Sequence, residues 1–128
     1  MTDCLLPFEQ IKKKKDLIPK PLAVNAKMYK SVKYYPLITS RQDDAPNFSM
    51  RLFEIGPDGY TGKHKHSYEH EVFILSGSGV ILKGEVKTKI KKDDSIFIPP
   101  YEMHQLLAGK DGINFICVVP NRLKNQPD

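Results

Sequence analysis

Short apolar runs separated by turn residues make up most of the sequence after residue 29. The clearest runs end next to a glycine, serine or proline, and they lie at residues 48–55, 71–75, 80–83, 95–98 and 114–119. Runs of this length, bounded by turn-forming residues, are typical of β-strands. No apolar stripe recurs at helical spacing in this part of the chain. The pattern therefore predicts an all-β domain, a small antiparallel sandwich or barrel of short strands.

Residues 56–59 (Gly-Pro-Asp-Gly) and 76–79 (Ser-Gly-Ser-Gly) are predicted to be turns that separate strands. Residues 85–91 alternate strictly, with Val86, Thr88 and Ile90 on one face and charged residues on the other. This alternation predicts a strand with one face in solvent and the other against the core.

The first 28 residues follow a different pattern. Residues 8–16 are predicted to form a short helix, because a proline precedes them and lysines occupy the end where the helix dipole favours cations. Pro19 and Pro21 would stop this helix. We expect residues 1–28 to be a basic N-terminal extension that packs along the domain surface or is partly mobile, and residues 29–128 to be a single domain.

Composition and length limit the classes of protein. The chain has 128 residues, which fits one domain, and no apolar stretch is long enough to cross a membrane. The N-terminus lacks the pattern of a secretory signal, and two cysteines, Cys4 and Cys117, cannot make a disulfide framework. We therefore expect a cytoplasmic protein.

The net charge of +5 lies entirely in the first 33 residues, which hold eight lysines and three acidic residues. The other residues carry equal numbers of basic and acidic side chains. The run Lys12 to Lys15 could bind phosphates or anionic lipid. No aromatic interleaving or nucleic-acid-binding motif accompanies it, so a solvated segment is favoured, with neither nucleic acid nor membrane as a partner.

The histidines carry the candidate chemistry. Two residues apart on a strand, His64 and His66 project from the same face and can reach one metal ion. His70 follows closely enough for a bend to return a third ligand, and His104 follows a proline turn into another strand. A lone histidine is more often a surface or core residue, but the His-x-His-x3-His cluster favours metal binding.

Residues 59–77 resemble the first motif of the cupin superfamily, in which Gly-x5-His-x-His is followed by a glutamate and then a glycine. Gly59, His64, His66 and Gly77 are in register, and His70 stands near the usual glutamate. Residues 93–108 match the second motif less fully, with Pro99 and His104 in place. The resemblance implies a cupin double-stranded β-helix, a jelly-roll-like barrel, as in small single-domain cupins with four histidines. It implies one divalent metal ion (Mn, Fe, Zn, Ni or Cu), held by the following residues: His64, His66, His70 and His104.

The motif also permits Glu71 to replace or supplement His70 as a ligand. Strand periodicity favours His70, because Val72 and Ile74 share its parity and would line the interior with it, whereas Glu71 would face outward. Four neutral nitrogens would leave the full charge of the ion on the site, which favours anionic substrates.

The fold alone selects no reaction. One hypothesis is a metal-dependent enzyme, oxygenase-like or decarboxylase-like, acting on a small organic acid, phenol or carbohydrate derivative. The alternative is a non-catalytic module that binds a metal or small ligand. Small cupins commonly form homodimers, and we expect one here.

Other pocket residues are harder to place from the sequence. For Arg51 an outward salt bridge is the favoured interpretation, and the alternative is an inward side chain that orients a carboxylate. Tyr68, Phe97 and Tyr101 could wall the mouth of the site, although core positions are more usual for aromatics. Cys117 is expected to be an inert core thiol.

Overall fold

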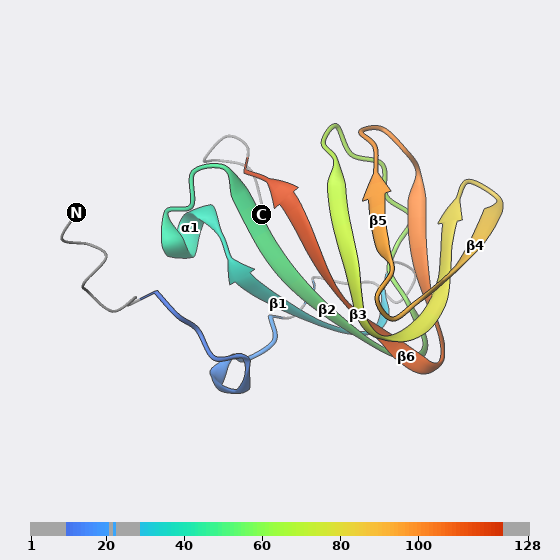
Figure 1. The fold of residues 1–128 in the computed structure, drawn as a ribbon, viewed down its shortest axis with the longest axis horizontal. Helices are drawn as coiled ribbons and strands as arrows, with labels where there is room; N and C mark the ends of the chain where they lie inside the picture. Colours follow the sequence, from blue (N-terminus) through green and yellow to red (C-terminus); the bar gives the residue numbers. More distant parts are fainter. Residues whose placement is uncertain (1–9, 21, 23–28, 122–128) are drawn as a thin grey trace.

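The computed structural model describes residues 10–20, 22 and 29–121, and it is an all-β barrel (Figure 1). Its strands are β1 (Lys30–Ile38), β2 (Phe48–Tyr60), β3 (His70–Lys83), β4 (Val86–Lys91), β5 (Ser95–Ile98) and β6 (His104–Pro120). A one-turn helix, α1 (Ser40–Asp43), connects β1 to β2, and a 3-10 turn covers Lys14–Asp16. The predicted fold class is therefore confirmed. Among the described residues, no helix is long and apolar enough to span a bilayer.

All named strand pairs are antiparallel, in the order β1-β2-β6-β3-β4. Outside this order, β5 pairs with the first residues of β3. Figure 1 shows the sheet curling, with β1 at one edge and β4 at the other. The strand β6 lies between β2 and β3, so the longest strand is also the central one.

The prediction of short strands is wrong for β2, β3 and β6, which have 13, 14 and 17 residues. The two expected turns are irregularities inside continuous strands. The register of β2 against β6 shifts between Ile55 and Tyr60, and that of β3 against β6 shifts around Gly77. Gly and Pro mark bulges as readily as turns, since both interrupt the ladder, and a bulge lets one strand bend around the barrel.

The bulges also change which side chains face the interior. In β6 the buried side chains are at even positions up to Ala108 and at odd positions from Ile113 onward. Gly112, at φ +76, lies at this switch, and Gly77, at φ +80, lies beside it in β3. One strand can therefore supply inward-facing residues to both ends of the barrel.

A continuous apolar core fills the barrel. Ile74 and Ile113 are almost completely buried, at 0% and 1% exposure. The buried cluster comprises the following residues: Ile55, Val72, Ile74, Ile90, Ile98, Leu106, Ala108, Ile113, Phe115, Cys117 and Val119. The prediction for β4 is only partly right, because Ile90 is buried but Val86 is 65% exposed at the edge strand.

The N-terminal segment packs along the surface over residues 10–20, as expected. Lys20 forms an isolated β-bridge with Tyr34, and Lys12 Nζ lies 2.6 Å from a carboxylate oxygen of Asp43. Lys14 contacts Glu54 at 3.1 Å. The helix predicted at residues 8–16 is wrong within the described part, which contains only the 3-10 turn, while residues 8 and 9 lie outside it.

Candidate metal centre

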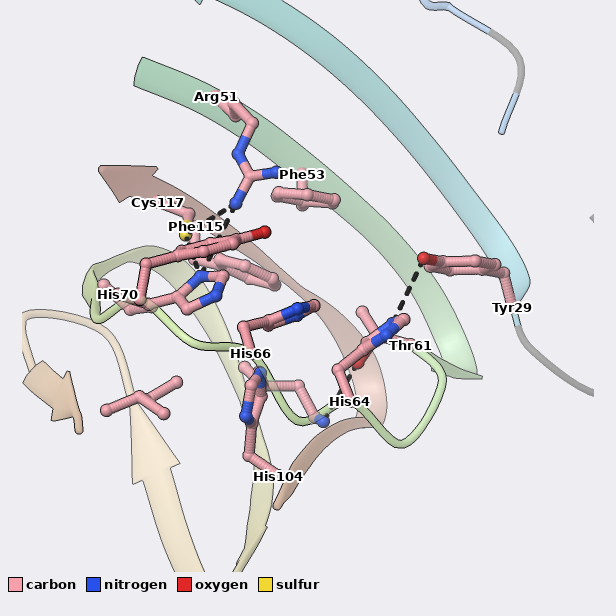
Figure 2. Close-up of a pocket in the computed structure, with 14 residues that line it drawn as sticks. Tyr29, Arg51, Phe53, Thr61, His64, His66, His70, His104, Phe115 and Cys117 are labelled. Carbon is pink, nitrogen blue, oxygen red and sulfur yellow. Dashed lines mark hydrogen bonds between the residues drawn. The ribbon is translucent and has the colours of Figure 1, made fainter. Parts of the chain in front are cut away.

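Three parts of the chain bring the four histidines together. The segment 61–66 leaves β2 and runs along the first half of β6, because the backbones of His64 and His104 exchange two hydrogen bonds of 2.9 Å. Thr61 extends the same pairing, with its N–H donating to the Leu106 carbonyl at 3.0 Å. His70 opens β3 and His104 opens β6, which places them at opposite ends of the β3–β6 ladder. The curl of the sheet brings both side chains, with those of His64 and His66, to one cavity (Figure 2).

His66, His70 and His104 form a compact cluster. One ring nitrogen from each lies within 4.8 Å of the others, close enough for a single ion to contact all three. His70 and His104 are buried, and His66 is half-buried. The inward position of His70 confirms the parity argument, since Val72 and Ile74 are buried with it and Glu71 is exposed.

His64 stands beside this cluster rather than inside it. Its Nε2 lies 3.1 Å from the Tyr29 hydroxyl, and Figure 2 shows its ring directed toward Tyr29. Its ring centroid remains 5.3 Å from that of His66 and 6.2 Å from that of His104. The structure thus brings three of the four predicted ligands together, and the role of His64 as the fourth stays a prediction.

The outer nitrogens of two cluster histidines already have partners. His104 Nδ1 lies 2.9 Å from the Glu102 carbonyl, to which it can only donate, so its Nε2 carries the lone pair. His70 Nδ1 lies 3.1 Å from Cys117 Sγ, while His70 Nε2 is buried with no hydrogen-bond partner among the described residues. Outer partners of this kind fix the ring orientation and tautomer of metal-binding histidines.

Burial favours the neutral form of His70 and His64. It lowers the pKa of His70 to about 3, and the charge of Arg51 and the neighbouring histidines act in the same direction. The pKa of His64 is also lowered, first by burial and then by His104 and Arg51. A neutral imidazole is the form that ligates metal ions.

Arg51 points into the barrel, so the favoured interpretation of an outward salt bridge is wrong. Its Nη2 lies 3.5 Å from His70 Nδ1 and donates to Cys117 Sγ at 3.4 Å (Figure 2). Its guanidinium lies over the Phe53 ring, with 5.6 Å between Cζ and the centroid. Position 51 faces inward because Arg51 pairs with Cys117 across the β2–β6 ladder, and Cys117 belongs to the core.

Arg51 and the histidine cluster line one cavity of about 110 Å³. Its walls are aromatic and aliphatic apart from these groups, and it is lined by the following residues: Tyr29, Arg51, Phe53, Thr61, His64, His66, Tyr68, His70, Val72, Ile98, His104, Leu106, Phe115 and Cys117. A space of this size, with few polar groups converging on it, suits a small molecule.

Of the three aromatic residues that were candidates for the wall of the site, the structure places one in the cavity and two outside it. Tyr68 lines the cavity and stacks on His66 and His70, with centroids 4.9 and 5.2 Å apart. Tyr101 and Phe97 lie outside the cavity and are 65% and 58% exposed. Tyr29 was not among the candidates, because only the pairing of β1 with β2 carries it to the site.

Cys117 is buried as expected, but it contacts a cluster histidine rather than apolar side chains alone. Burial raises the pKa of its thiol against the opposing effect of Arg51, so the thiol is neutral at pH 7. The sequence gives little signal for the contact between Cys117 and His70. It predicts only that Cys117 lies on a core strand and that Val72, two residues after His70 on the same face, points inward. Their pairing in the β3–β6 ladder follows from the register.

The geometry described above matches a known family. The family model for the cupin domain matches residues 51–119, which is more than half of the chain. The chain is a cupin. The matched range includes the four histidines, Arg51 and Cys117.

Several relatives of this cupin have enzyme names. It is 33% identical over 79 residues to a 1-methylthio-D-xylulose 5-phosphate methylsulfurylase of Rhodospirillum rubrum, covering 61% of this chain and 50% of the relative. It is 25% identical over 87 residues to the dimethylsulfoniopropionate lyase DddW of Ruegeria pomeroyi, covering 68% of this chain and 57% of the relative. The chain thus spans little more than half the length of these relatives.

Among solved structures, this cupin is similar to the polyketide cyclase RemF from Streptomyces resistomycificus. The TM-score is 0.74 at 28% identity, and the match covers 86% of this chain and 78% of that chain.

The lowered pKa of His70 predicts how the stability of the metal-free cupin depends on pH. Between about pH 6.5 and 3, the unfolded chain binds a proton at His70 that the folded chain does not. The free energy of unfolding should therefore fall as the pH drops through this window, by on the order of 1 kcal/mol per pH unit from this residue. Urea unfolding of metal-free protein at pH 7, 5.5 and 4.5 measures it. A His70→Gln variant should lose stability less steeply, and equal slopes for the two proteins would contradict the prediction.

Proposed function

We propose that this cupin is a metal-dependent enzyme that binds one divalent transition metal ion (Mn, Fe, Zn, Ni or Cu) and acts on a small organic molecule. His66, His70 and His104 would hold the ion, and His64 would be the fourth ligand once its ring turns away from Tyr29. The observation that carries the proposal is the cluster of three ring nitrogens within 4.8 Å of one another at the wall of a cavity.

The residues present fit a metal ion. The buried, unpartnered His70 Nε2 is unfavourable without a ligand, because an unsatisfied buried polar atom costs on the order of 1–3 kcal/mol. The contact at His104 Nδ1 leaves the lone pair of its Nε2 available to an ion. His70 Nε2 would offer its lone pair in the same way when His70 Nδ1 donates its hydrogen to Cys117 Sγ. All-imidazole donor sets suit Zn, Cu, Fe and Ni, and manganese remains compatible when it is the available ion.

A bound ion would supply Lewis-acid polarisation of a substrate oxygen or, for a redox metal, electron transfer. The chain's own residues do the rest. The walls formed by Phe53, Phe115 and Leu106 exclude water, and the small cavity limits the substrate to a few heavy atoms beside the cluster. Arg51 lies beside His70 in the same cavity and supplies a fixed positive charge.

The comparisons support an enzyme over the alternative, a non-catalytic binding module. Relatives named as a methylsulfurylase, a lyase and a cyclase carry out different reactions, so the reaction class follows from the site rather than from any one of them. For this site we propose oxygenase-like or decarboxylase-like chemistry on a small organic acid, phenol or carbohydrate derivative.

Metal analysis of the purified protein tests the proposal. The wild type, loaded with each candidate ion and then desalted, should retain about one ion per chain. Lys13→Ala, on the exposed N-terminal segment, should retain the same amount, whereas His104→Ala should lose at least about 100-fold in affinity. Absence of bound metal from the wild type under every loading condition would overturn the proposal.

The position of His64 predicts how much its replacement weakens metal binding in the same assay. Because its Nε2 contacts Tyr29 rather than the cluster, His64→Ala should weaken metal binding by less than His104→Ala does. An equal loss would show that His64 ligates the ion as strongly as the other three.

A further inference from the structure

We propose that Arg51 is a specificity-determining residue that anchors a small monocarboxylate substrate. The carboxylate would pair with the guanidinium, and the rest of the molecule would extend toward the histidine cluster. This inference rests on the proposed function, since it specifies the substrate class of the same site.

The first argument is that Arg51 has no anionic partner among the residues that the structure describes. In the part of the chain that the structure describes, the salt bridges are made by Lys12, Lys14 and Lys83. The residues that line the cavity include no aspartate or glutamate. An inward-facing charge without a counter-ion is costly to bury, and an anionic ligand would remove that cost.

The second argument is that the guanidinium keeps hydrogen-bonding capacity for a ligand. Its Nε is buried and has no hydrogen-bond partner among the described residues. Its Nη2 has two weak contacts, with Cys117 Sγ at 3.4 Å and with His70 Nδ1 at 3.5 Å. Phe53 lies against the guanidinium plane, which leaves the in-plane donors for another group. A planar guanidinium with free in-plane donors matches a carboxylate, to which it can donate two parallel hydrogen bonds.

The third argument is distance. Arg51 Nη2 lies 3.5 Å from His70 Nδ1, so only the width of one imidazole ring separates the guanidinium from the cluster side of His70. A molecule that reaches both groups must carry its carboxylate only a few bonds from the atom that meets the histidines. A 2-oxo or 2-hydroxy acid has this spacing.

The fourth argument is charge and size. Arg51 is the sole lysine or arginine lining the cavity among the described residues, and the remaining walls are largely apolar. The guanidinium and a bound metal ion would together balance either anion, but a phosphate dianion brings twice the charge of a carboxylate to be desolvated in these surroundings. The volume of about 110 Å³ likewise favours a short carboxylic acid over a sugar phosphate.

The test compares two ligands and two arginine variants. Pyruvate and its neutral methyl ester are titrated into manganese-loaded protein by calorimetry, with metal content measured for every sample. Arg51→Gln removes the charge from the cavity. Arg41→Gln, in the exposed helix α1, removes a charge elsewhere and is the matched control.

The expected result is that Arg51→Gln retains its metal and binds pyruvate roughly 10- to 100-fold more weakly, as expected for the loss of a charge-assisted pair. Methyl pyruvate should bind both proteins equally, and Arg41→Gln should behave as the wild type. Inorganic phosphate should bind the wild type more weakly than pyruvate.

Two outcomes would overturn the inference. Equal pyruvate affinity in the wild type and Arg51→Gln, with metal present in both, would show that Arg51 is not the anchor while leaving the metal-dependent enzyme intact. Tighter binding of phosphate than of pyruvate would refute the substrate class. If no sample retains metal, the proposed function fails, but the titration of metal-free protein still shows whether carboxylate binding depends on Arg51.

Discussion

Replacing His70 with alanine should abolish tight metal binding. His70 is the most enclosed candidate ligand of the cluster, and its Nε2 has no hydrogen-bond partner among the described residues. Its ring contacts those of His66, Tyr68 and His104. Loss of an outer partner of a ligand typically costs 10- to 100-fold in affinity, so loss of the ligand itself should cost at least about 100-fold. Competition with a chromogenic chelator measures the dissociation constant.

The matched control for this change is Glu71→Ala, one residue along the same strand. Glu71 is exposed and lies on the opposite face of β3, so its removal should leave metal affinity unchanged. A loss of affinity in Glu71→Ala comparable to that in His70→Ala would show that the carboxylate ligates the ion and that β3 shifts its register when metal binds.

The second large effect is expected at Gly77, where β3 bends. This residue has φ +80, and a Cβ placed on it would lie 2.1 Å from the Gly112 carbonyl oxygen. Gly77→Ala would therefore combine the cost of a left-handed conformation with a backbone clash, about 3 kcal/mol or more in total. Thermal unfolding should show a decrease in melting temperature of roughly 10 °C.

Gly84→Ala separates the two causes. Gly84 also has a positive φ, +58, in the tight turn between β3 and β4, but a Cβ there would have no atom within 4 Å. It should cost only about 1 kcal/mol, from the backbone conformation alone. Equal destabilisation by the two substitutions would show that the contact between Gly77 and Gly112 does not hold the bend.

The alternation of residues along single strands was enough to place His70 inside the barrel and Glu71 outside. That parity depends only on neighbouring residues, since side chains on a strand alternate between faces. The spacing of His64 and His66 likewise predicted that both lie at one site. Cytoplasmic location and a homodimer remain predictions that the fold does not test.

The lengths of β2, β3 and β6 could not be predicted from the alternation of residues in the same way. A glycine-rich stretch reads as a turn or as a bulge, and the difference depends on whether a partner strand continues past it. Because β6 pairs with both β2 and β3 beyond their bulges, the stretches at residues 56–59 and 76–79 remain within the sheet.

The sequence by itself therefore determined the all-β class and that the histidines meet at one site, because strand periodicity and local motifs are properties of neighbouring residues. Only the tertiary structure decided that Arg51 and Cys117 face His70, and that Tyr29 contacts His64. Those contacts join residues far apart in the chain. They depend on the register of β2 and β3 against β6 and on the return of the segment 61–66 along β6, which no local pattern specifies.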